Sequence, residues 1–209
     1  MDTQSNIGKY IIWLLVAVIA AVGGYYAWQL LGQAASQAPQ NEEPLEVVPQ
    51  FSTYATSTFS ITYPQGYTVD DAYAYEGVPK KPIAGVKFTI PGAMATGTNL
   101  STDSGVSVEW LPRAQKCAGD IFLFDNVRSQ ELTVGSTTWS VATTSGAGAG
   151  NLYEEMVYAV VGSKPCTAVR YLLHSTNIGN YDPGAVREFD RLKLIADFNA
   201  IRDSLTLSQ

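Results

Sequence analysis

The longest apolar stretch of the chain runs from Tyr10 to Leu31 and contains no charged residue. A helix rises about 1.5 Å per residue, so about 20 apolar residues are needed to cross the hydrocarbon core of a bilayer. Aromatic side chains favour the two membrane interfaces, and they lie near both ends of this stretch: Tyr10, Trp13, Tyr25, Tyr26 and Trp28. The pattern predicts a transmembrane helix, with an anchor over residues 10–32.

The distribution of charge on either side of this stretch predicts its orientation. Lys9 lies just before it, and no Lys or Arg follows until Lys80. Because basic residues are retained on the cytoplasmic side, we expect residues 1–9 in the cytoplasm and the rest of the chain outside the inner membrane. The alternative is a cleaved signal peptide, whose apolar region usually spans only about 7–15 residues. The small residues at positions 34–36 keep that alternative open.

After the predicted anchor, residues 33–50 are rich in Gln, Ala, Pro and Glu and have no helical periodicity, which is typical of a linker. Alternation of apolar and polar residues then predicts short strands in a domain over residues 51–209. Loops between the later strands are too short for crossovers, so we expect antiparallel neighbours. The predicted strands cover residues 58–63, 67–75, 86–90, 105–111, 130–134, 137–143, 152–161 and 167–174.

A helix is predicted at the end of the domain. Asp190 is a good N-cap, and apolar residues recur every three to four positions after it. The residues of this stripe are Leu192, Ile195, Phe198, Ile201 and Leu205. A second, short helix is expected around Cys117. Strands followed by a closing helix predict the α+β class, with an antiparallel sheet flanked by helices.

Charge and cysteine content narrow the classes of partner and site. From Phe51 onward twelve Lys and Arg stand against fifteen Asp and Glu, without a basic run, so we expect no nucleic-acid partner and no patch for anionic lipid. Two cysteines, Cys117 and Cys166, lie in the part predicted to be exported, where an even number suggests a disulfide; two free thiols are the alternative. These cysteines and the single His174 do not have zinc-site spacing, so we expect no metal and no cofactor.

Two segments resemble a known family. The opening FSITYPQGY (residues 59–67) is similar to the first strand of PsbP-like domains, and the closing FNAIRDSL (residues 198–205) is similar to their last helix. This resemblance implies an antiparallel sheet between helices, and non-catalytic assembly or binding work outside a membrane. The segments 97–100 and 168–181 look like those of anchored bacterial envelope proteins without an assigned role.

The most site-like stretch is RYLLHSTNIGNY (residues 170–181), a strand end followed by a polar loop. Loops on a rigid sheet often hold binding residues. The candidate binding residues are Arg170, His174, Asn177, Asn180 and Tyr181. His174 beside Ser175 suggests a hydrolase, yet neighbouring residues of a strand point to opposite faces. We expect no catalytic residue in the chain.

Two further stretches have competing interpretations. SGAGAG (residues 145–150) leads into a strand, so we expect a mobile hairpin loop rather than a phosphate-binding loop. Four tyrosines with Asp70 and Asp71 would form an aromatic and acidic platform for a glycan, or one half-buried face of a sheet. These tyrosines are Tyr63, Tyr67, Tyr73 and Tyr75.

Together these observations predict a single-pass, membrane-anchored module of the cell envelope. Residues 10–32 would contact the lipid bilayer, and the exported domain would bind an envelope protein or glycan without catalysis. The alternatives are a peptidoglycan-binding module and an envelope hydrolase that uses His174.

Overall fold

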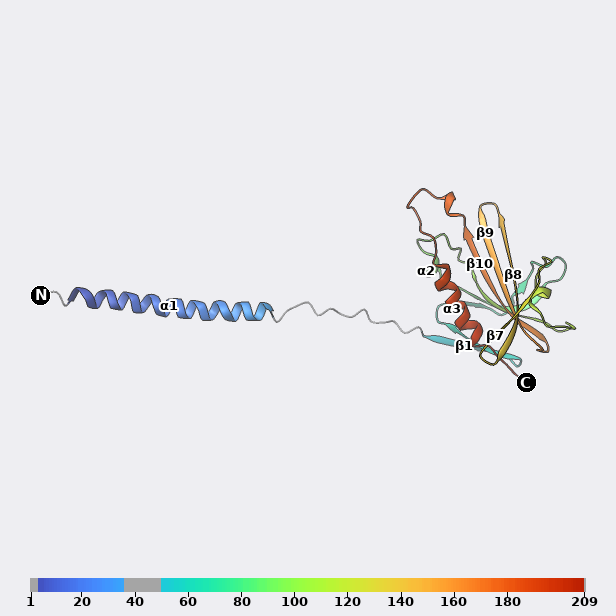
Figure 1. Ribbon diagram of the computed structural model, residues 1–209, viewed down its shortest axis with the longest axis horizontal. Coiled ribbons are helices and arrows are strands. Elements are labelled where there is room, and N and C mark those ends of the chain that lie inside the picture. The colour runs from blue at the N-terminus through green and yellow to red at the C-terminus, as the bar shows by residue number, and fades with distance from the viewer. Residues whose placement is uncertain (1–3, 36–49, 209) are drawn as a thin grey trace. The chain divides into compact units, whose positions relative to one another are not determined.

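The computed structural model describes residues 4–35 and 50–208 of the chain (Figure 1). The chain divides into two compact units, Met1–Val48 and Pro49–Gln209. Both hydrophobic clusters, the disulfide and every ion pair of the described residues lie inside the second unit. This unit therefore has a core of its own.

The first unit contains the helix α1 (Gln4–Ala35). Within the described residues, no helix combines the length and the apolar character that crossing a membrane requires. The side chains at positions 10–12, 15, 30 and 31 of the predicted anchor lie outside the described residues, as does most of the predicted linker, positions 36–49. The anchor and the linker therefore stay predictions from the sequence.

The second unit is built on a large antiparallel sheet, as the strand pattern predicted. Its order is β3-β5-β6-β10-β9-β8-β7, and β4 pairs with β5 at the side of this path. Sequential neighbours pair through tight hairpins at β7–β8 and β8–β9. The strands are β3 (Thr68–Asp70), β4 (Ala74–Tyr75), β5 (Ile83–Thr89), β6 (Gly105–Leu111), β7 (Gln130–Val134), β8 (Thr137–Gly148), β9 (Asn151–Val160) and β10 (Cys166–Thr176).

A smaller antiparallel sheet of order β1-β2-β11 joins the two ends of this unit's chain. It consists of β1 (Phe51–Ala55), β2 (Phe59–Pro64) and β11 (Thr206–Leu207). The helical elements of the unit are α2 (Gly92–Ala95), the 3-10 turns η1 (Gly119–Phe122) and η2 (Ile178–Asn180), and α3 (Arg191–Asp203). The predicted α+β class is confirmed. The expectation of flanking helices was too broad, because α3 is the single long helix among the described residues of this unit.

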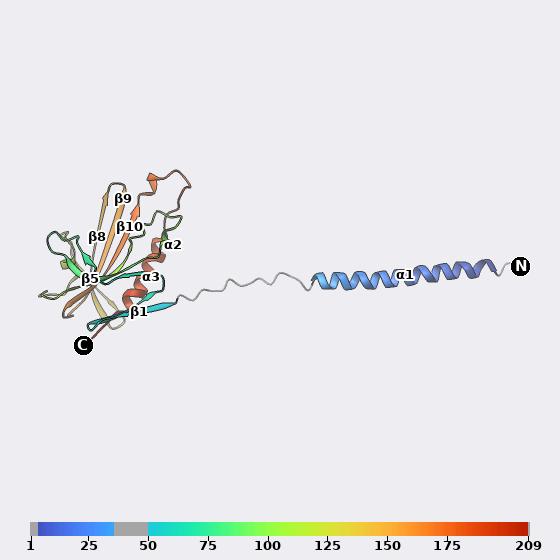
Figure 2. The same cartoon turned by 180° about the vertical axis from the view of Figure 1, so that it is seen from behind.

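One face of the large sheet, here called the α3 face, is buried by α3 and the small sheet (Figures 1 and 2). Val169, Tyr171 and Leu173 point to this face from β10, because alternate residues of a strand share a face. The ring of Tyr171 lies 5.4 Å from that of Phe198 in α3, in an edge-to-face arrangement. This face therefore forms a core of aliphatic and aromatic side chains.

The predicted apolar stripe of α3 was partly wrong. Leu192 is 77% exposed, whereas Leu194 is buried together with Phe198 and Ile201. At 3.6 residues per turn, Leu192 lies about 200° around the helix from Leu194 and so faces away from the sheet. The predicted N-cap is confirmed, since the Asp190 carboxylate accepts a hydrogen bond of 2.9 Å from the backbone N–H of Lys193.

The opposite face of the sheet, here called the disulfide face, is covered by the segment that contains η1. Cys117, before η1, is bonded to Cys166 at the start of β10, with the sulfur atoms 2.10 Å apart and the Cα atoms 5.0 Å apart. Phe122 of η1 is fully buried in the hydrophobic cluster beneath this segment. The predicted disulfide is therefore confirmed. It joins η1's segment to the sheet.

The expected loop over residues 145–150 is mostly a strand. Residues 145–148 belong to β8 and pair with β9, and the turn is limited to Ala149 and Gly150, both with positive φ. Gly146 lies opposite Tyr153 in this ladder. Small residues here accompany a large cross-strand neighbour, which an interpretation based on glycine content alone does not reveal.

Candidate functional site

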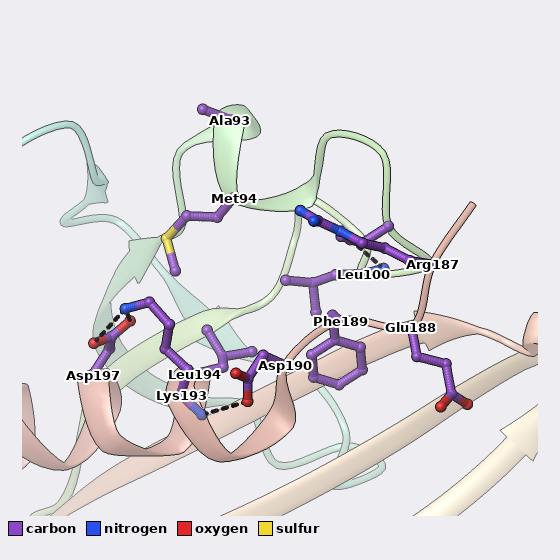
Figure 3. A pocket seen from close by; sticks show the side chains of 11 residues that line it. Ala93, Met94, Leu100, Arg187, Glu188, Phe189, Asp190, Lys193, Leu194 and Asp197 are labelled. Carbon is purple, nitrogen blue, oxygen red and sulfur yellow. Dashed lines mark hydrogen bonds and ion pairs between the residues drawn. The ribbon is translucent and has the colours of Figure 1, made fainter. Parts of the chain in front are cut away.

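A pocket of about 380 Å³ lies between α2 and the first turns of α3 (Figure 3). Met94 points from α2 toward α3, and Leu100 and Leu194 lie between the two helices. Glu188 points away from them. The pocket combines apolar side chains with charges of both signs: Ala93, Met94, Thr98, Leu100, Arg187, Glu188, Phe189, Asp190, Lys193, Leu194 and Asp197 line it.

Asn99 holds the two sides of this pocket together. Its buried side chain donates to the carbonyl of Thr176 at 2.8 Å and accepts from the backbone N–H of Phe189 at 3.0 Å. Its backbone N–H donates to the carbonyl of Arg187 at 3.1 Å. Because both ends of this amide are hydrogen-bonded inside the domain, the fold holds the backbone segments on the two sides of the pocket together.

The charges of the pocket are only partly satisfied. Lys193 pairs with Asp197 one turn later in α3, with 3.2 Å between Nζ and Oδ2. Asp190 is engaged as the N-cap. The exposed Arg187 has no ion pair among the residues that the structure describes. Arg187 is therefore the cation that the pocket can offer to a partner.

Burial and the charge of Asp197 raise the pKa of the Tyr67 phenol, which contacts Met94 of α2. Its hydroxyl lies 3.8 Å from the sulfur of Met94. Tyr67 is therefore neutral across the physiological range and contributes packing to the wall behind the pocket. It contributes no charge there.

Arg170, predicted as a binding residue, is instead the centre of a buried ionic cluster on the disulfide face. Its guanidinium binds the Glu109 carboxylate through Nε at 2.8 Å and Nη2 at 2.9 Å, and it also pairs with Glu155. Nη2 donates to the carbonyl of Phe122 at 2.8 Å, and the Tyr75 ring centroid lies 3.4 Å from Cζ. Arg170 is 1% exposed, so no partner reaches it in this conformation.

The electrostatics of this cluster favour the charged state of Arg170. Burial by itself would lower the pKa of Arg170, but the hydrogen bond and charge of Glu109, together with the charge of Glu155, raise it overall. Burial raises the pKa of Tyr75, whose hydroxyl donates to both oxygens of Glu155 at 2.9 and 3.0 Å. Each group has a partner, so the cluster is a structural element and has no reactive group left free.

His174 lies at the far end of β10 on the same face of the sheet as Arg170. Its Nδ1 is 2.7 Å from Oδ1 of Asp103, and its ring stacks on Tyr153 with 4.4 Å between the centroids. Nε2 is buried and has no hydrogen-bond partner among the described residues. A Ser-His-Asp hydrolase needs a nucleophilic hydroxyl at that nitrogen. Ser175 points to the opposite face, so the described residues provide the His-Asp pair without the nucleophile.

The remaining predicted residues shape the loop after β10. Asn177 caps η2 by accepting from the backbone N–H of Gly179 at 2.9 Å. Asn180 donates to the carbonyl of Gly150 at 3.0 Å and so connects this loop to the β8–β9 turn. Tyr181 is exposed. The five predicted residues therefore do not converge on one site: Arg170 and His174 belong to the sheet, and the other three belong to the loop.

The predicted tyrosine platform is divided between the two faces of the sheet. Tyr63 and Tyr67 pack in the core of the α3 face, where Tyr63 lies 4.8 Å from the Phe88 ring. Tyr75 belongs to the ionic cluster on the other face, and Tyr73 lies there too, beside Gly85 and Lys87 of β5. The four tyrosines therefore do not form a common glycan surface.

No metal site is formed by the described residues, in which no group of three or more His, Cys, Asp and Glu could hold an ion. The sequence analysis did not predict the α2–α3 pocket. Its lining comes from residues 93–100 and 187–197, and no motif connects these segments. The available signal was the Asp190 N-cap, which marks the start of α3.

No protein-family model matches the chain, and no curated protein matches it. A crystal structure from Bacteroides thetaiotaomicron is similar over 72% of this chain, with 11% identity and a TM-score of 0.42. The match covers 45% of that protein, so this chain spans less than half of its length. The solution structure of PsbP (CyanoP) from the cyanobacterium Synechocystis is similar over 81% of this chain and 99% of its own, with 11% identity and a TM-score of 0.32. The resemblance to PsbP-like domains is thus accompanied by a weak similarity in structure.

Proposed function

We propose that the chain is a single-pass, membrane-anchored module whose extracytoplasmic domain binds a protein of the cell envelope at the α2–α3 pocket. The observation that carries the binding role is the pocket itself, with apolar side chains between two helices and, at the edge, an Arg187 that forms no ion pair within residues 4–35 and 50–208. Protein interfaces combine an apolar centre with a polar rim in this way. The pocket is open to a side chain or a short segment of a partner.

Two features support the location outside the cytoplasm. The charge-free stretch Tyr10–Leu31 is long enough to span a bilayer. The disulfide Cys117–Cys166 is a bond that persists in oxidising compartments and is rare in the cytosol. Both agree with residues 1–9 in the cytoplasm and the domain beyond the inner membrane.

A binding role also agrees with the way in which the ionisable side chains of the sheet are paired with one another. Arg170, Glu109 and Glu155 satisfy one another, and His174 is paired with Asp103. An envelope hydrolase that uses His174 would need a nucleophile from outside the described residues. We therefore propose that the domain works by recognition, without catalysis.

The test is site-specific photocrosslinking of the full chain in its native membrane. A photoreactive residue at position 193, which lines the pocket and leaves Arg187 in place, should capture one discrete envelope protein, whereas the same residue at the exposed Ser136, in the β7–β8 turn, should not. Ala93→Asp places a charge at the exposed edge of the pocket and should abolish the capture from position 193. Ser136→Asp is the matched control and should leave the capture unchanged.

Equal capture from positions 193 and 136 would contradict the proposal, as would capture that survives Ala93→Asp. Urea unfolding of both Asp variants shows whether the domain is intact. Loss of capture with an unchanged unfolding midpoint assigns the effect to the pocket.

A further inference from the structure

Five basic residues that are far apart in the sequence lie at one end of the large sheet. Lys80 and Lys81 directly precede β5, Arg113 and Lys116 follow β6, and Lys164 precedes β10. The register brings these strand ends together. Gly85 pairs with Glu109, Glu109 with Ala168, and Leu111 with Cys166. The set of these five residues is called the basic end below.

The basic end has few charges to balance it. All five side chains are exposed, and none forms an ion pair among the described residues. Its acidic neighbours are the exposed Glu76 after β4 and Asp120 in η1, which accepts a hydrogen bond from Ser129 at 2.8 Å. Glu109 is buried and paired with Arg170. The basic end is therefore locally positive, although the whole chain has a net charge of −6.

An apolar groove opens at this end of the sheet, with Lys164 of the basic end in its lining. It has a volume of about 500 Å³ and is lined by Thr58, Trp110, Pro112, Ala114, Lys164, Pro165 and Cys166. The Trp110 ring is half-buried and rests against Phe59, with 6.3 Å between the ring centroids. A tryptophan that shares a groove with a basic side chain is typical of a surface that meets the interface of a membrane, where aromatic rings and basic side chains both concentrate.

We propose that the basic end docks the domain onto the anionic surface of a lipid bilayer, with lipid phosphates bound by the five cations and Trp110 at the interface. This inference rests on the proposed membrane anchor, which keeps a bilayer within reach. Fifteen residues separate α1 from β1, and their contour is at most about 50 Å. A tether of this length makes docking an intramolecular event at high effective concentration.

A bilayer fits these observations better than a soluble polyanion. The domain as a whole has more acidic than basic residues, so its attraction to anions in solution is confined to one end. Each Lys or Arg near an anionic surface raises the partition coefficient roughly fivefold.

The test is flotation of the domain from Pro49 onward with vesicles, because this unit has its own core. Vesicles of phosphatidylglycerol and phosphatidylcholine in a 3:7 ratio should bind the domain at low salt, and pure phosphatidylcholine vesicles should not. Lys80→Gln/Lys81→Gln/Lys164→Gln should lower the partition coefficient roughly 100-fold, from three cations at about fivefold each. Arg187→Gln/Arg191→Gln/Lys193→Gln removes the same charge elsewhere and should have no comparable effect.

Three results would overturn the proposal: equal binding to neutral vesicles, equal losses in the two triple variants, or no binding to anionic vesicles at low salt. Inorganic polyphosphate at the same phosphate concentration tests the competing partner, and tighter binding to it would assign the basic end to a soluble polyanion. This experiment omits the anchor and the α2–α3 pocket remains intact in Lys80→Gln/Lys81→Gln/Lys164→Gln. Its failure would therefore leave the proposed function standing, and crosslinking from position 193 can fail independently of it.

Discussion

Both faces of the large sheet carry a hydrophobic cluster, and the disulfide face adds a buried ionic cluster to it. On the α3 face, Phe198 and its neighbours exclude water with aliphatic and aromatic side chains. On the disulfide face, Arg170 and Glu109 form a buried ion pair beneath η1, and the Cys117–Cys166 bond joins that segment to the sheet. The comparison shows that a sheet face can be stabilised by buried apolar area or by a buried cluster of paired charges. The stability of such a cluster depends on every charged partner being present.

The largest effect is expected from removing one partner of the cluster. Arg170→Met leaves the fully buried Glu109 carboxylate without its cation, which should lower the free energy of unfolding by about 3–5 kcal/mol in urea melts. Glu109→Gln/Arg170→Met removes both charges and should recover part of that loss. Arg191→Met breaks the surface pair with Glu154 and is the matched control, with an effect of about 0–1 kcal/mol. If Arg170→Met cost no more than this control, the cluster would not stabilise its face.

The α3 face should respond to lost area instead of lost charge. Phe198→Ala should lower the free energy of unfolding by about 3–5 kcal/mol, because the ring is fully buried against Tyr171. Leu192→Ala, in the same helix but 77% exposed, should shift the urea midpoint very little. Similar shifts for both substitutions would mean that α3 does not present Phe198 to the sheet. The Phe198→Ala loss should also be insensitive to salt.

A smaller loss of folding stability is expected at alkaline pH, and it involves buried tyrosines on both faces of the sheet. Burial is the main cause that raises the pKa of Tyr73 on the disulfide face and Tyr171 on the α3 face. A raised pKa means that the folded state holds the proton more tightly. The stabilising contribution is therefore present below the unfolded pKa of about 10 and is lost as pH rises above it.

Urea melts at pH 8 and pH 11 measure this effect. The difference between the two should be smaller in Tyr73→Phe than in the wild type, whereas the exposed Tyr181→Phe should match the wild type. An unchanged difference in Tyr73→Phe would show that this phenol titrates as freely in the folded state as in the unfolded one.

The sequence predicted the α3 face better than the disulfide face, for a physical reason. Apolar periodicity is local, so β6 and β7 were predicted with the bounds that the structure has, and the Asp190 N-cap marked the start of α3. The sequence placed Leu192 on the buried side of α3, but this residue lies about half a turn around the helix from the buried Leu194. The burial of Arg170 has no local signal, because its partners Glu109 and Glu155 come from other strands.

The same reason explains what was missed on the surface. The α2–α3 pocket and the basic end each combine segments that only the register of the sheet brings together. The sequence shows no basic run, yet Lys81, Arg113 and Lys164 flank the ends of three neighbouring strands at the same end of the sheet. Predicting either surface requires the strand order β5-β6-β10, which periodicity does not provide.

The central claim is that the folded domain lies outside the inner membrane while residues 1–9 stay inside. A single Ser36→Cys substitution in the full chain tests this most directly, because the two native cysteines are bonded to each other. An impermeant maleimide added to intact cells, with any outer membrane permeabilised, should label position 36 to the same extent before and after lysis. Labelling that appears only after lysis would place the domain in the cytoplasm and contradict the account.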